Sequence, residues 1–264
     1  GASGFIGQPL VRALVRAGYT VRAAMRRPVP FPKSVKVVIV PDFNNSIDWY
    51  PFLQGVDIVI HLAGLTHADS RDHAFGAYDQ VNRITTLELA RVAKDVSVDH
   101  FVYISSVRAQ TGPSSTRIVD EEDEPRPTDH YGRSKLAAEL AIRSVGLPFT
   151  IFRPVAIYGP HSKGNIRRLL QLAASPVPLP LKGFNNRRSL LGIDNLIDAI
   201  LFVLNNKTTI GEKFLIADAA PLKLPELIAM LRKAQGRKSG LVYVPPFFIR
   251  LALLLSGQRR LWER

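Results

Sequence analysis

Cysteine is absent from the 264 residues, which excludes disulfide bonds and thiolate metal ligands. Long uncharged apolar runs are absent too. The nearest candidate, residues 241–257, is interrupted by Pro245, Pro246 and Arg250, whereas a membrane span needs about 18 apolar residues. We interpret this stretch as the entry to an amphipathic core helix, with a membrane-surface role as the alternative. We expect a cytoplasmic protein with no membrane span and no bound metal.

Acidic residues are missing from two segments of a chain whose formal charge is +13. Residues 1–40 carry seven Lys or Arg and residues 140–193 carry eight, and neither segment contains Asp or Glu. An acidic run, Asp120–Glu124, lies between them. Charge runs are usually solvated surface, and no zinc spacing or basic-aromatic interleaving indicates nucleic acid. In an enzyme, two basic segments would serve two phosphate-bearing small molecules.

Short apolar runs rich in β-branched residues alternate with helical patterns. We predict buried strands at residues 19–25, 35–40, 56–64, 100–106, 149–155 and 212–218. Apolar residues at three and four spacing predict helices at residues 9–18, 78–95 and 131–146. The alternation predicts a Rossmann-like α/β fold with a doubly wound parallel sheet.

Two regions are expected from this pattern. Residues 1–155 form a dinucleotide-binding domain. Residues 156–264 form mainly a smaller substrate-binding region over the carboxyl ends of the strands, with some elements returning to the main sheet.

The chain opens on a glycine turn, with Gly1, Gly4 and Gly7 at every third position. Such a turn allows the backbone to approach a pyrophosphate, and the helix from about Phe5 would point its amino end at the phosphates. The strand that normally precedes this turn is missing ahead of Gly1. We therefore expect the natural protein to begin several residues earlier.

The end of the second strand indicates which dinucleotide is bound. An acid there holds a ribose 2′-hydroxyl, whereas arginine accommodates a 2′-phosphate. This chain has Arg26 and Arg27 there and no acid before Asp42. Guanidinium groups bind phosphate in a fork, so NADP is favoured over NAD, which stays possible. The alternative is that both arginines are ordinary solvated residues.

Tyr131 and Lys135 lie four residues apart on a helical pattern, hence on one face. A phenol has a pKa near 10 and is a poor base at neutral pH, but a neighbouring ammonium group stabilises the phenolate. Ser106 ends a predicted strand 25 residues earlier and would donate a hydrogen bond to the same substrate oxygen. This set predicts proton exchange with a carbinol or carbonyl oxygen.

In this order the motifs resemble the extended short-chain dehydrogenase/reductase family, in its sugar-nucleotide epimerase/dehydratase branch. The resemblance covers nearly the whole chain, from residues 1–7 to the substrate-side motifs at residues 153–160 and 187–196. It implies that Tyr131 is the general acid/base, that Lys135 lowers its pKa and holds the nicotinamide ribose, and that Ser106 orients the substrate oxygen. The cofactor contacts that it implies, together with the arginines above, are Gly1, Ser3, Gly4, Phe5, Ile6, Gly7, Arg26, Arg27, Asp42, Phe43, Leu62, Ala63, Gly64, Asn82, Tyr131 and Lys135. The substrate contacts are Ser106, Asn165 and Arg188.

Departures from the family's patterns narrow the expected activity. Dehydratases carry an Asp-Glu pair where this chain has Val107 and Arg108, so dehydration is not expected. Ala156 stands where many 4-epimerases have a diphosphate-contacting Asn, and Arg26 suits an exchangeable NADP, which leans toward a reductase.

We therefore expect hydride transfer at C4 of a UDP- or dTDP-linked sugar, by a 4-keto sugar reductase or a UDP-sugar 4-epimerase that forms a homodimer. The alternatives are an NADP-dependent reductase of a steroid- or flavonoid-like ketone and a non-catalytic NADP-binding scaffold.

Overall fold

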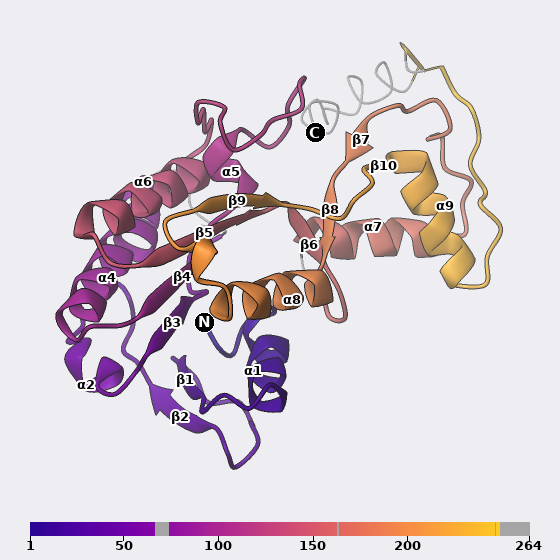
Figure 1. Cartoon of the computed structure of the whole chain (residues 1–264). Helices are drawn as coiled ribbons and strands as arrows, with labels where there is room; N and C mark the ends of the chain where they lie inside the picture. Colours follow the sequence, from indigo (N-terminus) through magenta and orange to yellow (C-terminus); the bar gives the residue numbers. More distant parts are fainter. Residues whose placement is uncertain (67–73, 163, 246, 249–264) are drawn as a thin grey trace. The chain divides into compact units, whose positions relative to one another are not determined.

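The computed structural model describes residues 1–66, 74–162, 164–245 and 247–248, without the side chains of residues 74, 75 and 165. The chain forms two compact units (Figure 1). Unit 1 comprises Gly1–Val155 and Ile193–Ile216, and unit 2 comprises Ala156–Gly192 and Ala217–Arg264.

A parallel four-stranded sheet forms the centre of unit 1. Its strands, in spatial order, are β3 (Ile58–His61), β4 (His100–Ile104), β5 (Phe149–Pro154) and β9 (Lys213–Ile216). The register pairs Val59 with Phe101 and Phe152 with Phe214. Every residue of β4 is buried, as expected for a central strand covered on both faces. The predicted α/β fold with a parallel sheet is confirmed.

Helices cover both faces of this sheet. α4 (Thr85–Asp95) and α6 (His130–Val145) pack together on one face, and α1 (Gly7–Arg16) and α8 (Ile193–Leu204) lie on the other (Figure 1). α6 is bounded by two capping residues: Asp129 at its start and Gly146, with φ of 71°, at its end. The shorter elements are α2 (Tyr50–Leu53), α3 (Ala74–Tyr78), the π-helical turn η1 (Asp79–Ile84), α5 (Val107–Gln110) and the 3-10 turn η2 (Lys207–Thr209).

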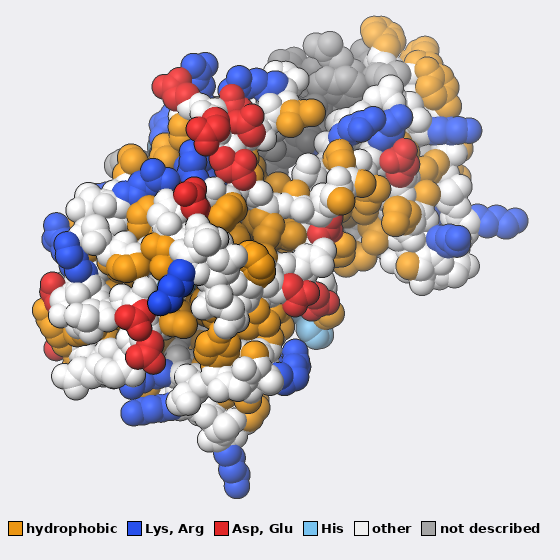
Figure 2. Space-filling view, in the orientation of Figure 1, with side chains coloured by type: hydrophobic (Ala, Val, Ile, Leu, Met, Phe, Trp, Pro, Cys, Tyr) orange, Lys and Arg blue, Asp and Glu red, His pale blue; other side chains and the backbone are white. Residues whose placement is uncertain are grey.

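The acidic run Asp120–Glu124 lies in the loop between α5 and α6, where Figure 2 shows acidic side chains gathered on the surface. This loop is tied to the sheet, because Glu121 Oε1 accepts a hydrogen bond from Leu215 N of β9 at 2.7 Å. Gln110 Nε2 of α5 donates to Asp123 O at 2.8 Å. The run is therefore partly structural and is more than the solvated loop that its charge suggests.

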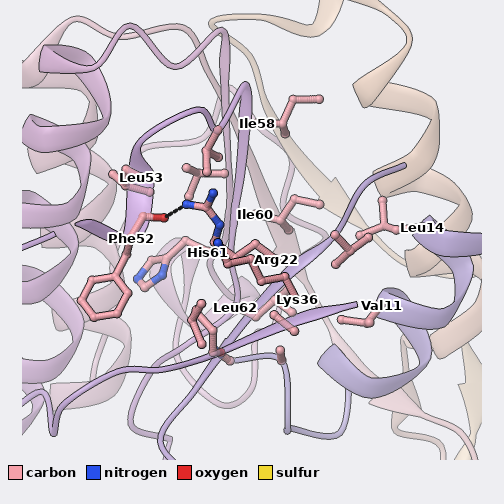
Figure 3. A pocket seen from close by; sticks show the side chains of 18 of the residues that line it. Val11, Leu14, Arg22, Lys36, Phe52, Leu53, Ile58, Ile60, His61 and Leu62 are labelled. Atoms are coloured by element: carbon pink, nitrogen blue, oxygen red, sulfur yellow. Dashed lines mark hydrogen bonds between the residues drawn. The ribbon is translucent and has the colours of Figure 1, made fainter. Parts of the chain in front are cut away.

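A separate strand pair completes unit 1. β1 (Arg22–Met25) and β2 (Lys36–Ile39) are parallel to each other and are not hydrogen-bonded to β3. A cavity of about 550 Å³ lies between β1, β3 and α1. Figure 3 shows Ile58 and Ile60 of β3 and Val11 and Leu14 of α1 among the side chains that line it.

Two small strand pairs and two helices lie in the described residues of unit 2. β6 (Ala156–Tyr158) is parallel to β8 (Leu190–Gly192), and β7 (Arg187–Arg188) is antiparallel to β10 (Leu222–Lys223). Helices α7 (Gly164–Ala174) and α9 (Leu224–Ala234) pack around a core that includes Ala173, Leu179 and Ile228. In the described parts of both units, no helix is long and apolar enough to cross a membrane.

Candidate active site

Tyr131 and Ser106 meet where β4 ends and α6 begins. Asp129 caps α6 by accepting a hydrogen bond from Gly132 N at 2.8 Å, and this places Tyr131 in the first turn. Ser106 follows β4 and caps α5, because its Oγ accepts from Arg108 N at 3.1 Å. Ser106 lies close enough to Tyr131 to lower the pKa of its phenol by side-chain hydrogen bonding. Two residues that are distant in the sequence thus share one hydrogen-bonded site.

Opposing effects set the acidity of the Tyr131 phenol. Burial raises its pKa, while the hydrogen bond from Ser106 and the positive charge of Arg108 lower it. The negative charge of Asp129 and the phenol of Tyr78 raise it further, and the net direction is upward. The phenol is therefore largely protonated in this structure at neutral pH.

Lys135 lies one turn after Tyr131 and is buried, with 3% of its surface exposed. Its Nζ donates to Ile104 O at 2.7 Å and lies 4.2 Å from the centre of the Tyr103 ring. Burial lowers the pKa of Lys135 to about 7, although the charge of Glu139 opposes this. The ammonium group is thus directed at a carbonyl oxygen, and its effect on Tyr131 remains a prediction.

Asn82 braces the turn that follows β3. It is buried in η1, where its Oδ1 accepts from Leu65 N at 2.7 Å and its Nδ2 donates to Leu65 O at 3.0 Å. The same amide donates to Ser134 Oγ of α6 at 2.9 Å. Asn82 therefore links the Leu62–Leu65 turn to the helix that carries Tyr131, and its contact with a cofactor stays a prediction.

The glycine turn borders a second cavity of about 360 Å³. Backbone packing excludes side chains there: a Cβ on Gly1 would lie 2.7 Å from Leu62 Cβ, and one on Gly7 would lie 2.6 Å from Ala2 O. A Cβ on Gly64 would lie 3.1 Å from Asn82 Oδ1 and 3.7 Å from Lys135 Nζ. These glycines make a close backbone cradle that fits a dinucleotide.

Most of the predicted cofactor residues border this cavity: Gly1, Ser3, Gly4, Arg26, Asp42, Phe43, Leu62, Ala63 and Gly64. Five lining residues were missed: Met25, Val40, Asn44, Leu65 and Val81. Met25 and Val40 end predicted strands and Leu65 follows one, positions that could have identified them, whereas Val81 lies in a predicted helix. The predicted residues Phe5, Ile6, Gly7 and Arg27 do not line the cavity. Gly7 instead gives the turn the space to close.

Arg26 and Asp42 lie together at this cavity, with Arg26 Nη1 3.7 Å from Asp42 Oδ1. Both side chains are more than half exposed, so their mutual attraction is weak. Asp42 is far from the end of β1 in the sequence. Because β1 and β2 are paired in parallel, their ends meet and Asp42 lies beside Arg26.

A buried polar network lies under Ser106. Glu139 and Arg153 form an ion pair, with Arg153 Nε 3.0 Å from Glu139 Oε1, and both residues are 2% exposed. Ser105 Oγ donates to Glu139, and Arg153 donates to Gln110 of α5. The ends of β4, β5 and α5 are therefore held together by charge-assisted hydrogen bonds. Sequence reasoning missed this network because its members are scattered along the chain.

The predicted substrate residues Asn165 and Arg188 belong to unit 2, apart from Tyr131 in unit 1. Arg188 lies in β7 and is half-buried. The side chain of Asn165 lies outside the described residues. Within the described parts of the chain, no group of three or more His, Cys, Asp or Glu side chains is arranged to hold a metal ion.

Residues 1–217 match the NAD dependent epimerase/dehydratase family. A UDP-glucose 4-epimerase from Vibrio cholerae is 30% identical over 273 residues, which cover 100% of this chain and 83% of the relative. A ceramide reductase from Caulobacter vibrioides (strain NA1000 / CB15N) is 31% identical over 198 residues, covering 74% of this chain and 56% of the relative.

A solved structure shares the arrangement of the chain. The UDP-glucuronic acid 4-epimerase from Bacillus cereus, in complex with NAD, superimposes with a TM-score of 0.78 at 25% identity. The match covers 92% of this chain and 84% of the other.

Proposed function

Because the chain belongs to the NAD dependent epimerase/dehydratase family of extended short-chain dehydrogenases/reductases, we propose that it oxidises or reduces C4 of a nucleotide-diphosphate sugar. The observation that carries the proposal is that Ser106, at the cap of α5, lies beside Tyr131, whose helix α6 also carries the buried Lys135. The epimerases from Vibrio cholerae and Bacillus cereus support C4 as the reacting position.

The cradle of Gly1, Gly4 and Gly64 would hold the cofactor's pyrophosphate side, with Phe43 and Arg26 at the adenosine side. When bound, a nicotinamide dinucleotide accepts or supplies the hydride. We infer a preference for NADP from Arg26. Its guanidinium would break the weak contact with Asp42 and bind a 2′-phosphate instead. Replacing Arg26 by Ala should raise the KM for NADPH by about tenfold and leave the KM for NADH nearly unchanged.

Tyr131 handles the proton of the reaction. In the oxidative direction its phenolate takes the proton of the C4 hydroxyl, and in the reductive direction its phenol returns a proton to the C4 oxygen. Ser106 donates a hydrogen bond that keeps the substrate oxygen against Tyr131. Lys135, once protonated, stabilises the phenolate and holds the nicotinamide ribose.

Unit 2 and its Asn165 and Arg188 would contact the substrate, with Arg188 directed to the diphosphate. A homodimer formed through α4 and α6 is also proposed, and Leu140 on α6, which is 59% exposed, supports such a contact. Light scattering after gel filtration tests the dimer. A cytoplasmic site of action is proposed on the lack of cysteine.

A panel experiment tests the reaction. The purified chain is mixed with NAD, NADH, NADP or NADPH and with UDP- and dTDP-linked sugars or their 4-keto forms, and cofactor absorbance and product stereochemistry are followed. Interconversion of two sugars without net cofactor change identifies an epimerase, and net oxidation of NADPH by a 4-keto sugar identifies a reductase. Tyr131→Phe, which removes only the hydroxyl, should lower kcat by at least about 100-fold while cofactor binding persists.

A second candidate is the reduction of an apolar ketone, which the ceramide reductase relative favours. The same panel, extended with steroid and long-chain ketones, separates the two. A chain that turns over none of these substrates, with Tyr131→Phe indistinguishable from wild type in every assay, would sink the catalytic proposal in favour of a non-catalytic scaffold.

A further inference from the structure

Arg108 connects the element that carries Ser106 to the element that carries Tyr131. Its Nε donates to Asp129 Oδ2 at 2.9 Å, and a shorter contact joins Nη2 to the same oxygen. Asp129 Oδ1 accepts from Gly132 N at 2.8 Å and so caps α6. One carboxylate therefore holds both Arg108 and the first turn of the helix that contains Tyr131.

The backbone of Arg108 is fixed at the same place. Arg108 N donates to Ser106 Oγ at 3.1 Å, so the residue contacts the serine hydroxyl directly. A Cβ at Gly132 would overlap the Arg108 carbonyl oxygen and would lie 3.1 Å from Pro127 Cβ. Only glycine lets α5 and α6 approach this closely.

Charged and titratable groups face Tyr131 from several elements. They are Arg108 on α5, Asp129 at the cap of α6, Tyr78 on α3 and Tyr103 on β4. Burial raises the pKa of Tyr131, and Arg108 is the cation that counters it, together with the hydrogen bond from Ser106. The Nζ of Lys135 donates a hydrogen bond to the Ile104 carbonyl oxygen.

We propose that Arg108 and Asp129 are positioning residues for proton transfer at Tyr131: Asp129 fixes the Arg108 guanidinium, which holds a positive charge beside the phenol, while the backbone N–H of Arg108 orients Ser106. The inference rests on the proposed function, in which Tyr131 exchanges a proton with the substrate. It also gives a role to the residue that stands where dehydratases of the family carry an acid.

Two variants should shift the reaction's pH dependence in opposite directions. Arg108→Gln removes the cation, so the rise of kcat with pH moves to higher pH and kcat at neutral pH falls roughly tenfold. Asp129→Asn keeps a capping oxygen but removes a negative charge, so the rise moves to lower pH. Arg108→Lys should restore the pH position while kcat stays below wild type, because a single ammonium lacks the planar fork.

Arg126→Gln is the matched control, because Arg126 also pairs with a carboxylate but lies on the surface with a side chain 75% exposed. Its pH profile should equal that of wild type. The overall KM for the sugar nucleotide should change less than kcat in the Arg108 variants, since the pair acts on the proton transfer.

A spectroscopic titration separates this inference from the proposed reaction. The ultraviolet absorbance of phenolate is titrated in each protein, and the same titration in its Tyr131→Phe counterpart is subtracted, so that only Tyr131 is seen without turnover. If no substrate reacts but the pKa of Tyr131 is higher in Arg108→Gln and lower in Asp129→Asn, the proposed reaction is wrong. The proposed effect of Arg108 and Asp129 on Tyr131 is then still supported.

An equal loss of kcat in both variants with no shift in either titration would show that the pair is only structural, and would overturn the inference. Far-ultraviolet circular dichroism checks folding. If Arg108→Gln fails to fold, Arg108→Lys and Asp129→Asn still decide between the two outcomes.

Discussion

At the scale of single residues, Lys135 shows how burial changes a side chain's chemistry. The residue has 3% of its surface exposed, its Nζ has one carbonyl partner, and the nearest carboxylate that supports its charge is Glu139 on the next turn. Burial lowers its pKa to about 7, with Glu139 opposing the shift. Near neutral pH the residue is therefore poised between its two forms.

This shift predicts a pH-dependent stability. The folded pKa lies near 7 and the unfolded value near 10.5, so between these values the unfolded chain binds more protons and stability rises with pH. Compared with Lys135→Met, the free energy of unfolding of wild type should rise by on the order of 2–4 kcal/mol across this window. Urea unfolding at several pH values measures it. Parallel curves for the two proteins would contradict the prediction.

At the scale of elements, the glycine turn is packed so closely that it has no room for a side chain at Gly7. A Cβ on Gly7 would overlap Gly1 O and come within 2.6 Å of Ala2 O, so the first turn of α1 is packed directly on the loop. The turn therefore depends on glycine for space, in addition to any role toward phosphate.

Gly7→Ala should destabilise the fold by about 2 kcal/mol or more, because backbone atoms must move. Gly76→Ala is the control, since Gly76 is also helical and a Cβ there meets no atom of the described residues within 4 Å. This control should be neutral or slightly stabilising. Thermal unfolding with and without NAD measures both effects, and equal melting temperatures for the two variants would refute the packing argument.

A cavity of about 550 Å³ separates β1 from β3 in unit 1. Both strands are parallel to their partners, residues from each line the 550 Å³ cavity, and Gly1 N donates to Ala24 O of β1 at 3.2 Å. Gly1 itself lines this cavity, so an engineered extension at Gly1 can be used to fill it. An extended apolar segment would pair with both edges and bury their side chains.

Five β-branched residues added ahead of Gly1 should raise the melting temperature by about 5 °C or more. The control is an extension of the same length built from Gly and Ser, which lacks the side chains to fill an apolar cavity and should have little effect. The same gain from both extensions would exclude strand insertion as the cause.

At the scale of the whole molecule, charge is divided between the units. Unit 2 holds 15 of the 35 Lys and Arg but only three of the 22 Asp and Glu, a formal charge of +12, against +1 for unit 1. Unit 1 contains the acidic run and the glycine cradle that is proposed to hold the dinucleotide. The excess positive charge therefore belongs almost entirely to the region proposed to bind a sugar diphosphate.

This division predicts different salt responses for the two ligands. Raising the salt concentration from low to above physiological values should raise the KM for the sugar nucleotide by about threefold or more, because screening weakens attraction to unit 2. The KM for NAD, whose cradle lies in unit 1, should change less. Steady-state kinetics in NaCl measures both, and equal responses would argue against electrostatic steering by unit 2.

Local patterns determined much of the structure and part of the site. The short β-branched runs form β3, β4, β5 and β9 as predicted, since strands in a sheet covered by helices are rich in apolar residues. The four-residue spacing of Tyr131 and Lys135 is realised on α6, and the glycine turn closes tightly. Each of these features depends on neighbours within a few residues, so the sequence alone contains the information.

Only the tertiary structure decided which distant groups meet. Arg108 and Asp129 are 21 positions apart, Asn82 and Ser134 are 52 apart, and the Glu139–Arg153 pair depends on the packing of α6 against β5. No periodicity encodes these contacts, because they arise where loops of unrelated length bring strand ends and helix starts together. The sequence by itself determined the α/β fold and the placement of Tyr131 and Lys135 one turn apart on one helix. Packing alone decided that Lys135 faces a carbonyl and that the cation countering burial at Tyr131 is Arg108, since both depend on burial and through-space distance.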